Sequence, residues 1–121
     1  MEAQKEIPIG TELSSDDLLS TFRDIFGQSD ELIKQWFPIF DLEQELTYTF
    51  ETDKDRDIKP PEGALLSEVY NVYVKDESGE TVMTIYMMPT VNPEVVTFAW
   101  DIYDEALRKE IGGKVPVQFK L

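Results

Sequence analysis

The spacing of hydrophobic residues changes near residue 45, and this change constrains the fold more than any other feature of the sequence. Before it, apolar side chains recur at the spacing of one helical face: Leu18, Leu19, Phe22, Ile25 and Phe26. After it, Leu46, Tyr48 and Phe50 alternate with polar residues, as in a strand with one buried face. A chain with both periods in separate stretches is typical of helices packed on a sheet, so we predict an α+β fold.

Two helices are predicted before residue 41. The first begins after Ser14, because Ser14 and Asp17 form a Ser-x-x-Asp capping pattern, and Gly27 can adopt the left-handed conformation that ends it. The second begins at Ser29 and ends before Pro38, which has no backbone N–H to donate. Because the connection between them is short, we expect the two helices to form an N-terminal helical hairpin.

Alternating hydrophobic patterns predict strands at 45–51, 68–75, 81–88 and 115–121. The second and third are joined by a turn at Asp76–Gly79, and because both are apolar on both faces we place them at the centre of the sheet. Pro116 places the last strand at a sheet edge. We therefore expect a mainly antiparallel sheet of four to five strands that ends in an edge strand.

The segment 92–113 supports two interpretations. Asn92 and Pro93 suit a helix start, and Gly112 and Gly113 suit a helix end, so we favour one long helix in the C-terminal half. The alternative is a fourth strand over Val95–Trp100, which is β-branched and aromatic, followed by a shorter helix. In either case residues 1–121 are expected to form one domain, with an extended or frayed lead-in over residues 1–12.

The composition argues against most catalytic chemistry. The chain has no His and no Cys, which removes imidazole acid/base chemistry, thiolate nucleophiles and thiolate metal sites. The spacing Asp53-x-Asp55-x-Asp57 resembles the start of a calcium loop, but Ile58 and Ala64 stand where that loop needs Gly and Glu. We therefore expect a protein that is not an enzyme, with no cofactor and no metal.

The net charge favours a cationic protein partner. With 25 acidic and 11 basic residues the formal charge is −14, and residues 1–68 carry 17 acids and 6 bases, or −11 of it. Such a surface repels nucleic acid and anionic membranes, and it accelerates encounter with a basic protein. The longest apolar run, Ile85–Met88, is too short to span a membrane, and the N-terminus lacks a secretory signal, so we expect a cytoplasmic location.

In size, charge and lack of catalytic side chains the chain resembles small acidic inhibitors, such as immunity proteins against nuclease toxins. The sequence thus predicts an inhibitor or immunity-type factor that engages a basic protein such as a nuclease or a nucleic-acid-binding protein. A negative surface also serves solubility, and the sequence leaves that interpretation open. The candidate contact acids are Asp16, Asp17, Asp24, Asp30, Glu31, Glu43, Glu45, Asp53, Asp55 and Asp57.

A second hypothesis is a small-molecule-binding or accessory domain with a pocket between sheet and helix. Aromatic and Met side chains on the two central strands and in the ambiguous segment suit such a lining. The candidate lining residues are Tyr70, Tyr73, Tyr86, Met88 and Trp100.

Overall fold

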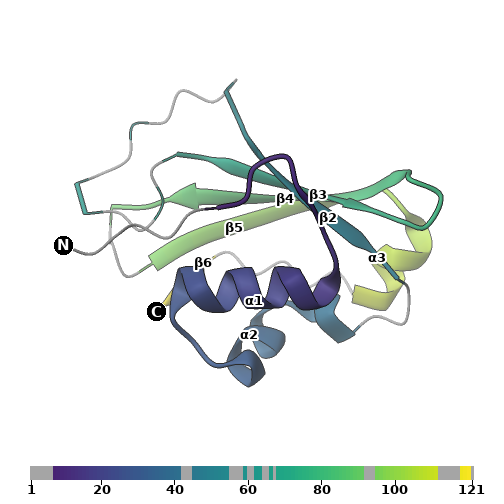
Figure 1. The fold of residues 1–121 in the computed structure, drawn as a ribbon, viewed down its shortest axis with the longest axis horizontal. Helices are drawn as coiled ribbons and strands as arrows, with labels where there is room; N and C mark the ends of the chain where they lie inside the picture. Colours follow the sequence, from purple (N-terminus) through teal and green to yellow (C-terminus); the bar gives the residue numbers. More distant parts are fainter. Residues whose placement is uncertain are drawn as a thin grey trace.

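A computed structural model of the chain describes residues 7–41, 45–54, 59, 62–63, 66, 68–91, 95–111 and 118–120. Its elements are, in chain order, β1 (Glu12–Leu13), α1 (Ser15–Phe26), α2 (Asp30–Trp36), the 3-10 helix η1 (Pro38–Asp41), β2 (Thr47–Thr52), β3 (Tyr70–Lys75), β4 (Thr81–Pro89), β5 (Val95–Ile102), α3 (Glu105–Ile111) and β6 (Gln118–Lys120). These strands form one antiparallel sheet in the order β1-β2-β3-β4-β5-β6. Helices α1 and α2 lie on one side of it (Figure 1). The predicted α+β class is confirmed.

Local capping determines where the first two helices begin and end. The side-chain oxygen of Ser14 accepts a hydrogen bond from the backbone N–H of Asp17 at 3.2 Å, and Ser29 accepts one from the third residue of α2 at 3.3 Å. Gly27 has φ 67°, the left-handed conformation that favours glycine, and ends α1. The predicted boundaries of both helices are therefore confirmed, while their antiparallel packing as a hairpin stays a prediction.

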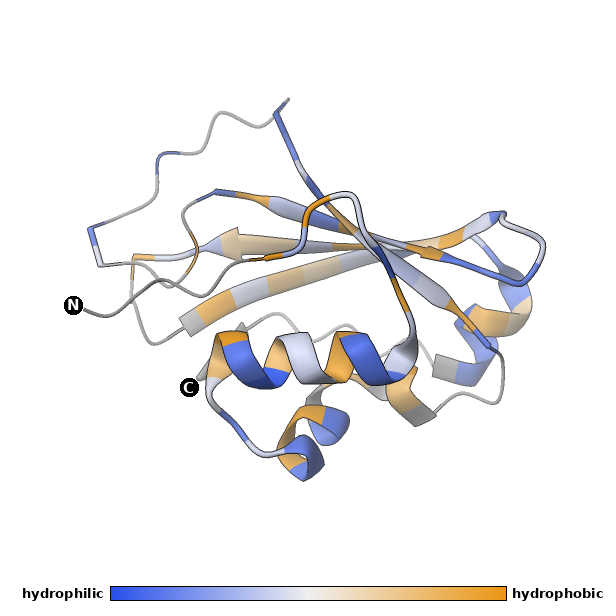
Figure 2. Ribbon diagram, viewed as in Figure 1, coloured by the Kyte–Doolittle hydropathy of each residue, from blue (hydrophilic) through white to orange (hydrophobic). Residues whose placement is uncertain are grey.

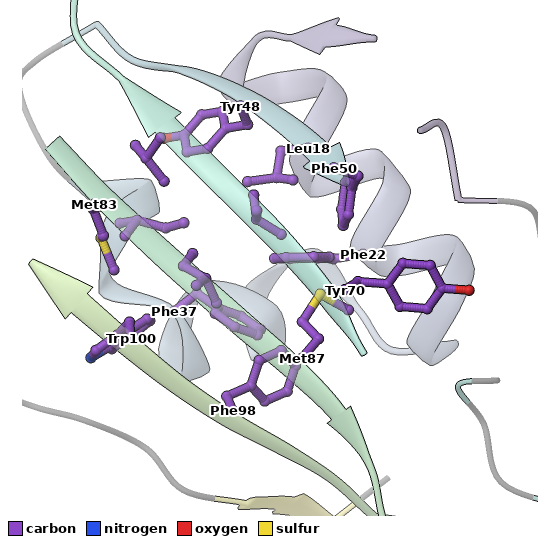
Figure 3. Packing of buried hydrophobic residues seen from close by; sticks show 14 of the residues in the cluster. Leu18, Phe22, Phe37, Tyr48, Phe50, Tyr70, Met83, Met87, Phe98 and Trp100 are labelled. Carbon is purple, nitrogen blue, oxygen red and sulfur yellow. The ribbon is translucent and has the colours of Figure 1, made fainter. Parts of the chain in front are cut away.

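An aromatic cluster joins the helices to the sheet. The ring of Phe37, just after α2, lies 4.7 Å from that of Phe22 on α1 and 4.9 Å, edge-on, from that of Phe98 on β5. Phe22 also meets Phe50 on β2 edge-on at 6.1 Å. Each of these side chains is at most 1% exposed. Figure 3 shows this packing, which places the hydrophobic core between the helices and one face of the sheet.

The strand register separates a core face of the sheet from an opposite face. Cross-strand pairing aligns Val72, Ile85 and Trp100 on the core face, where all three are buried. The hydrophobic bands of α1 in Figure 2 include the buried residues that cover this face. The opposite face, called the outer face here, carries Thr49, Glu51, Asn71, Tyr73, Thr84, Tyr86, Met88, Thr97, Ala99 and Asp101.

The single long helix that the sequence favours over 92–113 is wrong, and the alternative of a strand followed by a shorter helix is correct. Strand β5 pairs with β4 over seven residue pairs, and the side chains of Val96, Phe98 and Trp100 alternate into the core. Burial of these side chains outweighs the helical spacing of the same segment. The carboxylate of Asp104 then accepts a hydrogen bond from the N–H of Leu107 at 2.9 Å and caps α3. The expected helix ends at 92–93 and 112–113 lie outside the described residues.

The strands predicted at 45–51, 68–75 and 81–88 are present with small shifts at their ends, but the sheet has six strands in the described part of the chain, where four to five were expected. Of the last predicted strand, 118–120 are described and form β6, whereas 115–117, with Pro116, and 121 lie outside the described residues. Strands β3 and β4 lie at the centre of the sheet, and β6 forms one edge, paired with β5. Residues 12–13 at the end of the predicted lead-in form β1 at the other edge, where Glu12 pairs with Thr49. No helix in the described part of the chain has the length and apolar character needed to cross a membrane.

Candidate functional site

An open, acidic depression lies at one end of the sheet. Two adjoining cavities of about 420 and 380 Å³ share three lining residues, Glu45, Asp76 and Glu77, and together form one groove. We call this the acidic groove; the described residues that line it are Ser14, Ser15, Asp16, Glu45, Leu46, Thr47, Asp76, Glu77 and Ser78. Four of these residues are carboxylates, so the groove presents concentrated negative charge.

Three separate segments build the acidic groove. Antiparallel pairing of β2 with β3 aligns Thr47 with Lys75, so the segment that enters β2 lies beside the β3–β4 turn. The N-terminus of α1 completes the groove, and the hydroxyl oxygens of Ser15 and the buried Tyr48 lie 3.4 Å apart. Burial raises the pKa of Tyr48, and the hydrogen bond with Ser15 opposes that effect. The contact between Tyr48 and Ser15 therefore links β2 to the start of α1 beside the groove.

The Asp76 carboxylate organises the β3–β4 turn. Its Oδ1 accepts hydrogen bonds from the Ser78 hydroxyl at 2.6 Å, the Ser78 backbone N–H at 2.9 Å and the Glu80 backbone N–H at 3.0 Å. The hydrogen bond from the Ser78 hydroxyl is the largest cause, and with that from Glu80 it lowers the pKa of Asp76 below its ordinary value of 3.8. Asp76 is thus a turn-forming residue as well as one charge of the groove.

We expect Ser78→Ala to raise the pKa of Asp76, because the substitution removes the donor with the largest effect on it. A group whose pKa is lowered in the folded state stabilises the fold above its unfolded pKa, and this stabilisation is lost as the pH falls through the folded pKa. The stabilisation that the ionised Asp76 carboxylate gives to the turn should therefore be lost only below about pH 4. Carboxyl carbon NMR measures the midpoint directly. An unchanged midpoint in the variant, or a wild-type midpoint above 3.8, would contradict the assignment.

The structure brings together two of the ten candidate contact acids. Asp16 and Glu45 both line the acidic groove, and Asp17 lies beside Asp16 in the first turn of α1. The sequence interpretation missed Asp76 and Glu77, which it assigned to a turn. A signal for them was present in the sequence, because antiparallel pairing of two adjacent strands, here β2 and β3, brings the start of β2 beside the end of β3 and the turn that follows it.

The remaining candidate acids lie elsewhere or outside the description. Asp24 lies near the C-terminal end of α1, and Glu31 lies in the first turn of α2. The carboxylate of Asp30 pairs with Arg23 at 3.1 Å on the surface, where such pairs contribute little stability. Asp53 follows β2, at the opposite end of that strand from Glu45. The last three lie outside the described residues: Glu43, Asp55 and Asp57.

The five candidate pocket residues divide between the two faces of the sheet. Tyr70 and Trp100 lie on the core face, with 9% and 7% of their surface exposed. Tyr73, Tyr86 and Met88 lie on the outer face. The structure therefore does not bring the five together around one space between sheet and helices.

The described residues of the groove offer carboxylate and hydroxyl groups for charged and polar contacts. Among them, no group of three carboxylates is arranged to hold a metal ion. Burial, followed by the hydrogen bond to Asp101, raises the pKa of Tyr86, so its hydroxyl stays protonated at neutral pH, like that of Tyr48. Comparison of the chain with protein-family models, curated proteins and solved structures gives no significant match.

Proposed function

We propose that this chain is a non-catalytic acidic binding protein, of the inhibitor or immunity-factor type, that engages a basic protein such as a nuclease or a nucleic-acid-binding protein. The observation that carries the proposal is the convergence of Asp16, Glu45, Asp76 and Glu77 on one open groove. A cytoplasmic location is part of the proposal, since a chain without cysteine has no disulfide that needs an oxidising compartment.

The groove suits a cationic partner for two physical reasons. Its concave shape focuses the field of its carboxylates, which raises the rate of encounter with positive charge. The rest of the molecule reinforces this field, because the whole chain carries −14. The same charges repel phosphate groups, so direct binding of nucleic acid is disfavoured.

The test is the salt dependence of association with the partner. Capture on the immobilised chain at about 50 mM salt, with identification by mass spectrometry, supplies a partner whose association is then measured by stopped flow. We expect a basic protein whose association rate constant falls at least about tenfold between about 50 and 500 mM salt, because added ions screen the attraction. A rate constant that is insensitive to salt, or a captured partner without net positive charge, would overturn the proposal.

A further inference from the structure

The outer face of the sheet carries a cluster of hydrogen-bonded tyrosine and carboxylate side chains. The Tyr86 hydroxyl donates to the Asp101 carboxylate at 2.9 Å, and the hydroxyl oxygens of Thr84 and Tyr103 lie 3.1 Å apart. Asn71 pairs with Tyr86 across β3 and β4. We call the set the outer-face cluster; its members are Asn71, Tyr73, Thr84, Tyr86, Asp101 and Tyr103.

Asn71 has an unsatisfied acceptor inside this cluster. Its side chain is 8% exposed, and its amide nitrogen donates to the Tyr73 hydroxyl at 3.3 Å. Its carbonyl oxygen Oδ1 is shielded from solvent and accepts no hydrogen bond from the described part of the chain. Buried acceptors without a donor are uncommon and costly, which suggests that a donor from another molecule completes this one.

The surroundings of Asn71 select the chemistry of that donor. Glu51 pairs with Asn71 across β2 and β3, and Asp101 pairs with Thr84 across β4 and β5, so one carboxylate borders the cluster and another lies within it. A guanidinium group donates several N–H groups from one plane, pairs with carboxylates and stacks on aromatic rings. A lysine ammonium is a point charge that lacks the planar donor geometry.

We propose that the outer-face cluster binds an arginine side chain of the basic partner, and that Asn71 Oδ1 accepts one of its N–H groups. This proposal rests on the proposed function and names the residue type that the partner contributes. Tyr103 is 57% exposed and Tyr73 and Tyr86 are half-buried, and no described helix covers this side of the sheet (Figure 1). Entry of the guanidinium requires rotation of a tyrosine side chain, a change that is common at interfaces.

Octa-arginine and octa-lysine carry equal charge, so comparing their affinities separates recognition of arginine at the outer-face cluster from general attraction of positive charge. Fluorescence anisotropy at about 50 mM salt should show binding of both peptides, with octa-arginine tighter by about fivefold because of stacking on tyrosine and the added hydrogen bond. Asn71→Leu should reduce this preference to less than about twofold and leave the affinity for octa-lysine unchanged, because it removes the carbonyl acceptor, together with the amide donor to Tyr73, and leaves the net charge as it is.

Tyr103→Leu provides a second variant at an exposed position, in case Asn71→Leu does not fold, and should also reduce the arginine preference. Thr97→Ala, on the same face but outside the cluster, is the matched control and should retain it. Equal affinity of the wild type for both peptides, or an undiminished preference in either cluster variant, would overturn the inference and leave the proposed function standing. Binding of neither peptide would overturn both.

Discussion

Replacement of Phe37 by alanine is expected to lower the free energy of unfolding by about 3–5 kcal/mol. Phe37 has no exposed surface, and its ring contacts Phe22 on α1 and Phe98 on β5. Its removal therefore leaves a cavity where α1, the end of α2 and the sheet meet. For a chain of this size the loss corresponds to a decrease in melting temperature of about 10–20 °C. Urea unfolding followed by tryptophan fluorescence gives the free energy directly.

Phe37→Leu is the matched control, because it retains most of the apolar volume while it removes the edge-on ring contacts. Its expected cost is below about 2 kcal/mol. If the alanine variant lost less than about 1 kcal/mol, the core would be able to relax around the missing ring. That result would contradict the central position that the structure assigns to Phe37.

Local signals were sufficient to predict the first two helices from the sequence. Ser14 and Ser29 cap their helices through hydrogen bonds to residues three positions later, and Gly27 ends α1 through its own backbone conformation. None of these features depends on a distant part of the chain. The central position of β3 and β4 was also predicted correctly, because apolar and aromatic residues on both faces of a strand indicate the greater burial found in the middle of a sheet.

The segment 95–111 shows where local signals fail. Its apolar residues fit a helical stripe, and only pairing with β4 and packing of Phe98 against Phe26 and Phe37 favour the strand. These partners are distant in sequence, so the local spacing does not reveal them. Asp104 offered one local hint, since its carboxylate caps α3 and indicates a helix that begins after it.

The sequence predicted only some of the acids of the acidic groove, because the others are brought there by strand pairing between distant segments. The total charge indicated that acids matter, and two groove residues, Asp16 and Glu45, were among the ten candidates. Which acids converge depends on the register of β2 against β3, and this brings Asp76 and Glu77 to the same place. Asn71 left no signal, because a buried amide oxygen without a hydrogen-bond donor among the described residues is a property of the packed structure and not of the residue type.

Charge reversal in the acidic groove is expected to have the largest effect on binding. The triple variant Asp16→Lys, Glu45→Lys and Glu77→Lys changes the net charge from −14 to −8, because each reversal adds two units. All three side chains are exposed, so the fold should tolerate the changes. Because the groove then presents positive charge to a basic partner, the association rate constant should fall by roughly 10- to 100-fold at low salt. Stopped-flow association with the captured partner measures it.

The control variant Asp24→Lys, Glu31→Lys and Glu62→Lys has the same net charge and also reverses three exposed acids. Glu31 matches Asp16 in particular, since each lies in the first turn of a helix and a lysine there opposes the helix dipole to a similar degree. If net charge alone determines association, the association rate constant should fall equally in the two variants. If the partner binds in the groove, the rate constant of the control should fall by no more than about threefold. Equal losses would mean that long-range attraction by the whole molecule, and not the groove, attracts the partner.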